Sequence, residues 1–397
     1  MKRRDSLVRK CVHGALLSSV AWAVPGIALA GDLPEKAPAA VEPIPYWWFH
    51  GTVEAGGRFF LNNPQRNGSA YLGQQSLAKF YEYRDLRPGP FANVWLSTGS
   101  RDGLYEVDVG GKNIGYDDQG YYLEASKAGQ HYFNFDWDQT PHLYSTSAQT
   151  FYQGLGTGAL TLPPGLLHVP PNGFGNIPFV TGGTPTQIRP FLYQTDIGIR
   201  RDTGAVAYRW TPTDAWDIKA DYAHMSRTGT QVDGIVGFGN IGGGGSSATQ
   251  VPKPVDDTTQ NYGVNGEYAG TSPWGKKFTV KLAYNGSQYT DNLSSYLVQN
   301  PYNGTTGTVG QSPFARMSLP PGNNMNAIGG TASAELPWKS RYAGTLNYSM
   351  MRQNDAFQPM SFQQPGFPLP ASSLNGAVNT LLSNNVVTTQ ISPELTN

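Results

Sequence analysis

The sequence predicts an all-β protein, a large transmembrane antiparallel β-barrel of the outer-membrane type, to which this chain contributes roughly the N-terminal half. Short Pro/Trp turns recur at Pro212, Pro273 and Pro337, with spacings of 61 and 64 residues, enough for two spanning strands and one large loop. Polar and apolar residues alternate around these turns, as in strands with one face in lipid and one in water. Aromatic residues make up 12% of the chain and charged residues 14%, with 48 glycines, a composition that favours a barrel over a soluble enzyme.

Residues 1–30 have the features of a cleaved secretory signal peptide. Basic residues between Lys2 and Arg4 precede an apolar stretch that ends in the small-residue pattern Ala28-Leu29-Ala30. Residues 31–50 are then a Pro/Ala-rich periplasmic tail. Residues 51–397 form the predicted barrel.

Period-two alternation begins at Gly51. In residues 129–138, for example, Phe133, Phe135 and Trp137 share one face and polar residues share the other. A tilted membrane strand needs about nine to eleven residues, and each predicted strand has about that length. The thirteen predicted strands lie near 51–60, 77–86, 90–99, 103–110, 119–126, 130–138, 191–200, 203–210, 216–226, 260–269, 276–287, 326–335 and 341–352.

The polar strand face is predicted to line a water-filled lumen. Its charged candidates are Asp136, Asp138, Asp217, Lys219, Asp221, Lys277 and Lys281. Asp136 and Asp138 could in principle bind a cation or act as an acid/base pair. Because no second acidic cluster at ligand spacing accompanies them, a solvated lumen wall is the favoured interpretation.

Aromatic residues at strand ends are predicted to form an interfacial girdle, as in other outer-membrane barrels. The tryptophan candidates for this girdle are Trp47, Trp48, Trp210, Trp216, Trp274 and Trp338.

The predicted loops are unequal. The Pro/Trp turns are short and expected to be periplasmic, whereas residues 226–259, 288–324 and 353–397 are expected to be long outer loops. Strand parity places a Gly/Pro-rich segment, 139–190, on the periplasmic side, with an inward-folded plug as the alternative. No return strand is expected after residue 352. Since an open edge in lipid leaves backbone groups unpaired, we expect this chain to be part of a larger barrel or to close by oligomerising.

We predict no catalytic, cofactor-binding or metal-binding residues. The run Gly237-Phe238-Gly239-Asn240-Ile241-Gly242 matches a dinucleotide-binding pattern, but more glycines follow it and no βαβ unit surrounds it. The one cysteine, Cys11, lies in the signal peptide, so the mature chain is expected to attach no haem of its own. Lys+Arg and Asp+Glu balance at 28 each, which argues against nucleic-acid binding.

Several short runs along the chain form a recognisable set. The first are Gly56-Gly57-Arg58-Phe59 and Lys79-Phe80-Tyr81-Glu82-Tyr83-Arg84-Asp85-Leu86. Later runs are Leu319-Pro320-Pro321-Gly322-Asn323-Asn324, Leu336-Pro337 and Gln353-Asn354-Asp355. Together these runs resemble motifs of the MtrB/PioB family of decahaem-cytochrome-associated outer-membrane proteins, and the resemblance is closer to its PioB-like branch. The chain departs from the family in lacking the N-terminal Cys-x-x-Cys of some members and in being shorter than its members usually are.

The resemblance implies a barrel that sheathes a periplasmic multihaem c-type cytochrome, so that electrons cross the outer membrane in extracellular electron transfer. The barrel would carry no cofactor, and haem would come only through the partner cytochrome. Its further neighbours would be outer-membrane lipid and an extracellular cytochrome or metal donor or acceptor.

Two other classes remain open. A general or solute-selective diffusion porin would use lumen charges for selectivity, and a neighbouring gene with about ten C-x-x-C-H motifs would favour the conduit over the porin. A soluble secreted β-rich binding protein would remain soluble without detergent, whereas the apolar stripes predict insolubility.

Overall fold

The computed structural model describes residues 46–62, 77–164, 166, 189–236, 248–301, 314–359, 368–392 and 395–396. The predicted signal peptide, most of the predicted tail and the run 237–242 lie outside the described residues. The predicted all-β, antiparallel architecture is confirmed. No helix among the described residues is long and apolar enough to cross a membrane.

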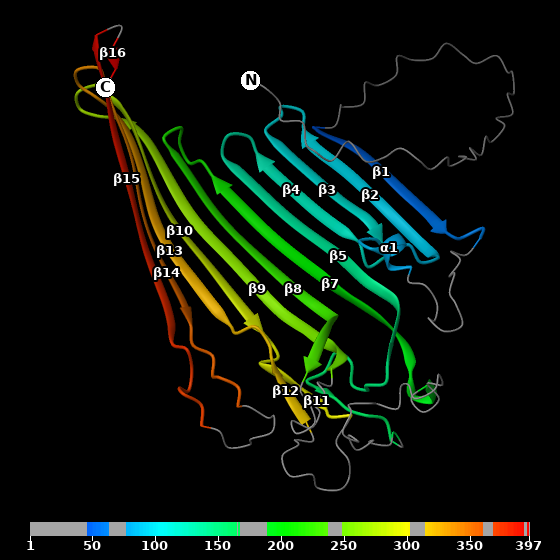
Figure 1. Ribbon diagram of the computed structural model, residues 1–397. Coiled ribbons are helices and arrows are strands. Elements are labelled where there is room, and N and C mark those ends of the chain that lie inside the picture. Colours follow the sequence, from blue (N-terminus) through cyan, green and yellow to red (C-terminus); the bar gives the residue numbers. More distant parts are fainter. Residues whose placement is uncertain are drawn as a thin grey trace, which may run out of the picture. The chain divides into compact units, whose positions relative to one another are not determined.

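Thirteen strands form one antiparallel sheet in the order β1-β2-β3-β4-β5-β7-β8-β9-β10-β13-β14-β15-β16 (Figure 1). Their bounds are β1 Trp47–Arg58, β2 Gly89–Ser100, β3 Tyr105–Ile114, β4 Gly120–Lys127, β5 His131–Thr150, β7 Tyr193–Trp210, β8 Trp216–Val236, β9 Ala248–Thr271, β10 Lys277–Asp291, β13 Asn323–Leu336, β14 Ser340–Gln353, β15 Gly376–Ser392 and β16 Leu395–Thr396. A second sheet of three strands has the order β12-β11-β6, with β6 Ala159–Leu160, β11 Ser295–Gln299 and β12 Phe314–Ser318. Among the described residues no ladder joins β1 to β15 or β16.

Five short connections lie at one end of the large sheet, which we call the turn end (Figure 1). They are residues 101–104, 128–130, 211–215, 272–276 and 337–339. Backbone hydrogen bonds join neighbouring connections, including Thr211 N to the Gln130 carbonyl at 2.8 Å. The opposite end, which we call the loop end, carries the longer connections, the helix α1 (Ala78–Tyr81) and the 3-10 turn η2 (Arg189–Phe191).

The central strands are longer than predicted. Strands β5, β7, β8 and β9 have 20, 18, 21 and 24 residues, about twice the length that spans a bilayer at a tilt. The prediction of separate strands at 191–200 and 203–210 is wrong, because Arg201 and Asp202 pair with β5 and β8 inside one continuous ladder. The predicted loop 226–259 is likewise mostly strand.

The predicted strand at 77–86 is wrong. β1 pairs directly with β2 along its whole length, from Trp47 opposite Ser100 to Arg58 opposite Gly89, which leaves no place for a strand between them. The segment instead forms α1 and a turn that covers β5 where β4 has ended. The Leu143 N–H donates to the Glu82 carbonyl at 2.9 Å, and the Leu77 N–H donates to Thr146 Oγ1 at 2.8 Å. These hydrogen bonds give partners to polar groups on the edge of β5 that β4 leaves uncovered.

The prediction that no return strand follows residue 352 is also wrong. β15 returns along β14, from Gly376 opposite Gln353 to Thr389 opposite Ser340. Its apolar residues come in adjacent pairs, such as Leu381-Leu382 and Val386-Val387, so it lacks the alternation that identified the other strands. The hydrogen-bonded ladder with β14 therefore defines β15 as a strand, although its own residue pattern does not indicate one.

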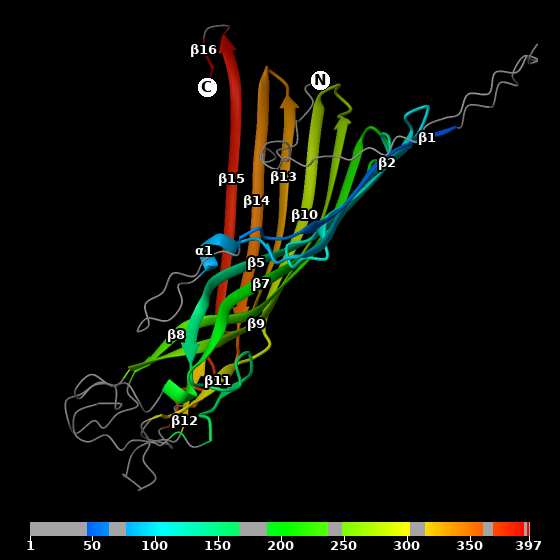
Figure 2. The same cartoon turned by 90° about the vertical axis from the view of Figure 1, so that its right-hand side faces the viewer.

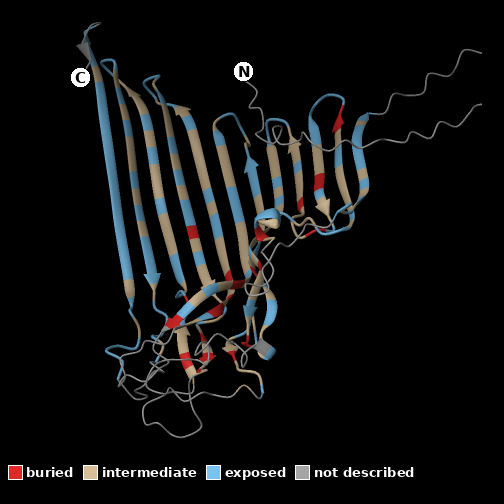
Figure 3. Cartoon of the chain, turned by 45° about the vertical axis from the view of Figure 1, so that its right-hand side comes forward, coloured by how far each residue is buried: buried red, intermediate tan, exposed pale blue. Residues whose placement is uncertain are grey.

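The prediction that 139–190 lies at the same end of the sheet as the short Pro/Trp turns is wrong for its described part. Because β5 continues to Thr150, the residues after it start at the loop end, and β6 pairs there with β11. Figures 1 and 2 both show β11 and β12 beside the loop ends of β8 and β9. The buried hydrophobic cluster lies in this region (Figure 3) and consists of Phe151, Tyr152, Leu160, Ile235, Val251, Tyr296, Val298, Ala315 and Leu319.

Candidate functional surface

The ladders divide the large sheet into two chemically distinct faces. Residues directly opposite each other on neighbouring strands point to the same side, so the register carries each face from strand to strand. One face carries Phe135, Ile218, Val280, Leu282 and Leu346, and we call it the apolar face. The other, which we call the polar face, carries all seven charged residues predicted to line a lumen: Asp136, Asp138, Asp217, Lys219, Asp221, Lys277 and Lys281.

The apolar face leaves large hydrophobic side chains in contact with the surroundings. Leu282 is 64% exposed, Ile328 61% and Leu346 55%. Soluble proteins rarely expose a contiguous apolar surface of this extent, whereas lipid-facing strands require one.

Aromatic residues mark two levels on the apolar face. At the turn end lie Trp47, Trp210, Trp216, Tyr268, Phe278 and Tyr342. A second level, six residues along β8, β9, β10 and β14, holds Tyr222, Tyr262, Tyr284 and Tyr348. Six residues of strand span about 20 Å. Trp274 and Trp338 lie in the turns, 64% and 89% exposed, and Trp48 lies on the polar face. The six-residue spacing of this tyrosine level from the first level is legible in the sequence.

Ion pairs join neighbouring strands at two places on the polar face of β7–β9. The Arg209 guanidinium donates to both carboxylate oxygens of Asp217, at 2.9 and 2.8 Å, and Lys219 Nζ lies 3.6 Å from the same carboxylate. Nearer the loop end, Arg227 donates to both oxygens of Asp257 at 2.9 and 2.7 Å. The Asp257 side chain is only 5% exposed, so this pair is largely withdrawn from water.

The small sheet packs on the polar side at the loop end. Ile235 and Val251, from its hydrophobic cluster, belong to the polar face of β8 and β9 by register. Tyr296 is fully buried, and its hydroxyl donates to Asp233 at 3.1 Å. Burial raises the pKa of this phenol, so Tyr296 remains a donor. The described part of the Gly/Pro-rich segment therefore packs against the polar face at the loop end.

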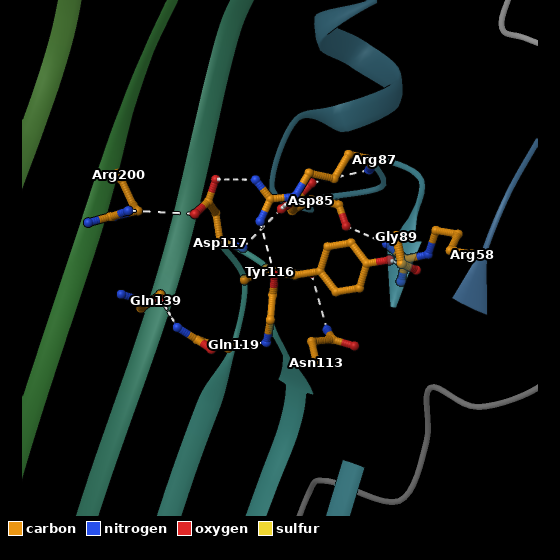
Figure 4. Close-up of polar contacts among 12 residues, drawn as sticks. Arg58, Asp85, Arg87, Gly89, Asn113, Tyr116, Asp117, Gln119, Gln139 and Arg200 are labelled. Carbon is orange, nitrogen blue, oxygen red and sulfur yellow. Dashed lines mark hydrogen bonds and ion pairs between the residues drawn. The ribbon is translucent and has the colours of Figure 1, made fainter. Parts of the chain in front are cut away.

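A cluster of charged residues, which we call the Asp85 cluster, joins the loop ends of β1 to β7 (Figure 4). Asp85 accepts from the Asp117 N–H at 3.0 Å and forms an ion pair with Arg87 Nε at 3.0 Å. Arg58 donates to the Asp85 carbonyl and lies 4.4 Å above the ring of Tyr116.

The periphery of the Asp85 cluster extends to β7. Arg200 Nη1 lies 3.6 Å from Asp117 Oδ1, and the Tyr116 hydroxyl donates to the Gly89 carbonyl at 2.8 Å. Next to it, Asp118 Oδ1 is buried without a partner among the described residues, and burial raises the pKa of Asp118. The cluster joins the two first family-like runs, since Arg58 comes from one and Asp85 from the other.

Among the described residues no group of three or more His, Cys, Asp or Glu side chains is arranged to hold a metal ion. Asp136 and Asp138 lie on one face, as predicted, and Lys112 Nζ lies 3.2 Å from Asp138.

Comparisons with known proteins identify the family. A family profile described as "outer membrane beta-barrel porin, MtrB/PioB" matches residues 74–396. The curated outer membrane protein MtrB of Shewanella baltica (strain OS185) is 22% identical over 295 residues, which are 73% of this chain and 38% of that relative. The chain thus spans well under half the length of the relative.

A solved structure, the ferric-catecholate import receptor Fiu of E. coli K12, aligns with 75% of this chain and 45% of its own, at 12% identity and a TM-score of 0.33. This likeness is too weak to carry an argument. The profile, in contrast, covers most of the chain, from before α1 to β16. The protein therefore belongs to the MtrB/PioB family of outer membrane β-barrel porins, and its place is the outer membrane.

Proposed function

We propose that the protein is the barrel subunit of a transmembrane electron conduit, which sheathes a periplasmic multihaem c-type cytochrome for extracellular electron transfer. The proposal starts from family membership and from the role that the family resemblance implies. Its action is structural rather than enzymatic. The barrel excludes lipid from the haem chain and holds the partner at a fixed depth in the bilayer.

The width of the polar wall is the observation that best supports this proposal. The described chain contributes thirteen strands to one sheet. Barrels of about eight strands are filled by their own side chains, whereas those of about 16 to 18 leave an aqueous channel. On β7 and β8 the polar face carries small residues, including Ala205, Ala207 and Ala223. A sheet with so many strands, and with small side chains on its polar face, leaves room for a folded partner.

The charge arrangement on β7–β10 also fits a sheath. The ion pairs Arg209–Asp217 and Arg227–Asp257 neutralise charge within the wall. The one cysteine of the sequence is Cys11, in the predicted signal peptide, so the redox centres would belong to the partner.

Proteoliposomes provide the test. The complete gene product and its partner cytochrome would be reconstituted together, and reduction of an enclosed dye by an external reductant would be followed. We expect fast transfer only when both proteins are present. Equal rates without the barrel would refute the conduit, and solute conductance by the barrel alone in planar bilayers would favour the porin.

A further inference from the structure

The polar face of β1–β5 differs from that of β7–β10 in its balance of charge. On β7–β10 the carboxylates, of which Asp221 and Glu267 form no ion pair among the described residues, share the face with basic side chains such as Lys277 and Lys281. The polar face of β1–β5 has few basic side chains, and by register it carries the carboxylates Glu54, Glu106, Asp108, Glu124 and Asp136, which form no ion pair among the described residues. Neutral groups donate to two of them: Asn93 Nδ2 to Glu54 at 2.8 Å, and Ser97 Oγ to Asp108. In the described part of these strands, the Lys112–Asp138 pair is the one ion pair that joins two strands on this face.

Two of the carboxylates stand directly opposite each other. Asp108 on β3 pairs in register with Glu124 on β4. Like charges in this position destabilise a sheet unless something neutralises them. An ion pair elsewhere in the wall cannot do so, because a Debye length at physiological salt is about 8 Å.

Aromatic rings interrupt the same surface, where alternation calls for polar residues. A Cβ added at Gly99 would lie 2.7 Å from the Trp48 indole, and one added at Gly110 would lie 2.1 Å from the Tyr122 ring. Each ring therefore lies over a glycine on the neighbouring strand. Trp95, also on this face, is 41% exposed. Tryptophan and tyrosine are the residues that most often anchor protein interfaces.

We propose that this surface, the acidic-aromatic face of β1–β5, is where the protein partner in the lumen docks, through a patch of Lys and Arg side chains. The inference rests on the proposed function and deepens it by stating the chemistry of the partner's contact surface. Carboxylates supply charge complementarity and the aromatic rings supply apolar contact. Small cations could neutralise the carboxylates, but they would leave Trp95 without a contact.

The test compares two charge-removal variants of the complete protein, expressed with its partner in the native host. The first is Glu106→Gln/Glu124→Gln/Asp136→Asn, on the acidic-aromatic face. The matched control removes three carboxylates from the polar face of other strands, Asp221→Asn/Glu267→Gln/Glu335→Gln. The c-type haem that copurifies with each tagged barrel is measured at low and high salt, and the folded state is checked by heat-modifiable gel mobility.

We expect the first variant to bind the partner about tenfold more weakly at low salt and the control to bind it like wild type. A second variant, Trp95→Ala, should weaken binding at both salt concentrations, which distinguishes a protein contact from a cation cloud. If wild type binds haem protein and the first variant matches it, the docking surface is wrong while the conduit stands. If wild type retains no haem protein, both proposals fail.

Discussion

The polar faces of β1–β5 and β7–β10 have the same alternation of polar and apolar residues, but they differ in how far basic residues balance the carboxylates. On β7–β10, Arg209 and Arg227 hold Asp217 and Asp257 across neighbouring strands, and further basic residues such as Lys281 lie on the same face. On β1–β5, carboxylates such as Glu124 and Asp136 have no basic neighbour within the ion-pair distance among the described residues. The alternation of polar and apolar residues thus determines which side meets water. The identity of the polar residues determines whether the charges on that side balance one another or call for a charged partner.

The glycines show the same contrast. On the acidic-aromatic face they make room for rings, as Gly99 does for Trp48. On the polar face of β9, Gly263 lies beside the Asp221 carboxylate and the Asn285 amide instead. The first arrangement places aromatic rings on the polar face, and the second places carboxylate and amide groups there.

The largest expected effect comes from breaking a buried ion pair on the polar face of β8 and β9. Arg227→Met should lower the free energy of unfolding by about 3 kcal/mol, because the carboxylate of Asp257 is left buried and unpaired. Urea unfolding in phospholipid vesicles, followed by tryptophan fluorescence, measures this. The double variant Arg227→Met/Asp257→Leu should recover most of the loss. A single variant as stable as wild type would show that the pair contributes nothing.

A smaller loss is expected from crowding a ring on the acidic-aromatic face. Gly110→Ala places a Cβ 2.1 Å from the Tyr122 ring and should cost about 2 kcal/mol as the ring is displaced. Gly266→Ala on β9 is the matched control, because its Cβ would meet nothing within 4 Å. The same unfolding assay compares them. Equal stabilities would mean that Tyr122 does not lie over Gly110.

Removing one of two opposed carboxylates should have the opposite sign. Glu124→Gln should raise the free energy of unfolding by about 0.5 kcal/mol at low salt, since it relieves repulsion with Asp108. Glu335→Gln, which removes the negative charge opposite Arg341, should lower the free energy of unfolding by a similar amount. Both changes should vanish at about 1 M salt, where screening is strong. Destabilisation by Glu124→Gln would contradict the inference that the carboxylates of Asp108 and Glu124 repel each other.

The smallest effect concerns Asp118, in the turn between β3 and β4. Burial raises its pKa, so its contribution to stability is complete below about pH 3.9 and is lost as the pH rises through the folded-state value. Asp118→Asn should therefore equal or slightly exceed wild type in stability at pH 7, and this advantage should disappear near pH 3. A pH series of thermal unfolding in detergent measures it. A clear loss at pH 7 would show that the carboxylate is needed as an acceptor.

Sequence patterning was sufficient where one strand face is apolar and the other polar. β8, β10 and β14 alternate cleanly beside the Pro/Trp turns, and parity alone put the seven charged candidates on one side. It failed at β15, because paired apolar residues give no period of two and only the ladder with β14 defines the strand. It failed again at 77–86, whose aromatic alternation reflects packing on β5: the Tyr83 and His142 rings lie 4.4 Å apart.

The Asp85 cluster was not predicted because its members come from separate connections. Arg58 and Asp85 are brought together only when β1 pairs with β2 and the intervening segment folds back over β5. The sequence did contain a signal, since both residues lie in runs that resemble the family's motifs. Such runs show that both residues belong to family-like motifs, but they do not show that the two side chains come together in the fold.

Labelling of single cysteines tests the central claim, that the polar face lines a lumen and that its β1–β5 part holds a partner. In a Cys11→Ser background, Leu123→Cys and Glu124→Cys place neighbouring thiols on opposite faces of β4. A membrane-impermeant maleimide is applied to outer membranes with and without the partner cytochrome. The account predicts that Glu124→Cys is labelled only without the partner and that Leu123→Cys is not labelled in either case. Labelling of Leu123→Cys as fast as Glu124→Cys, or labelling of Glu124→Cys unchanged by the partner, would contradict it.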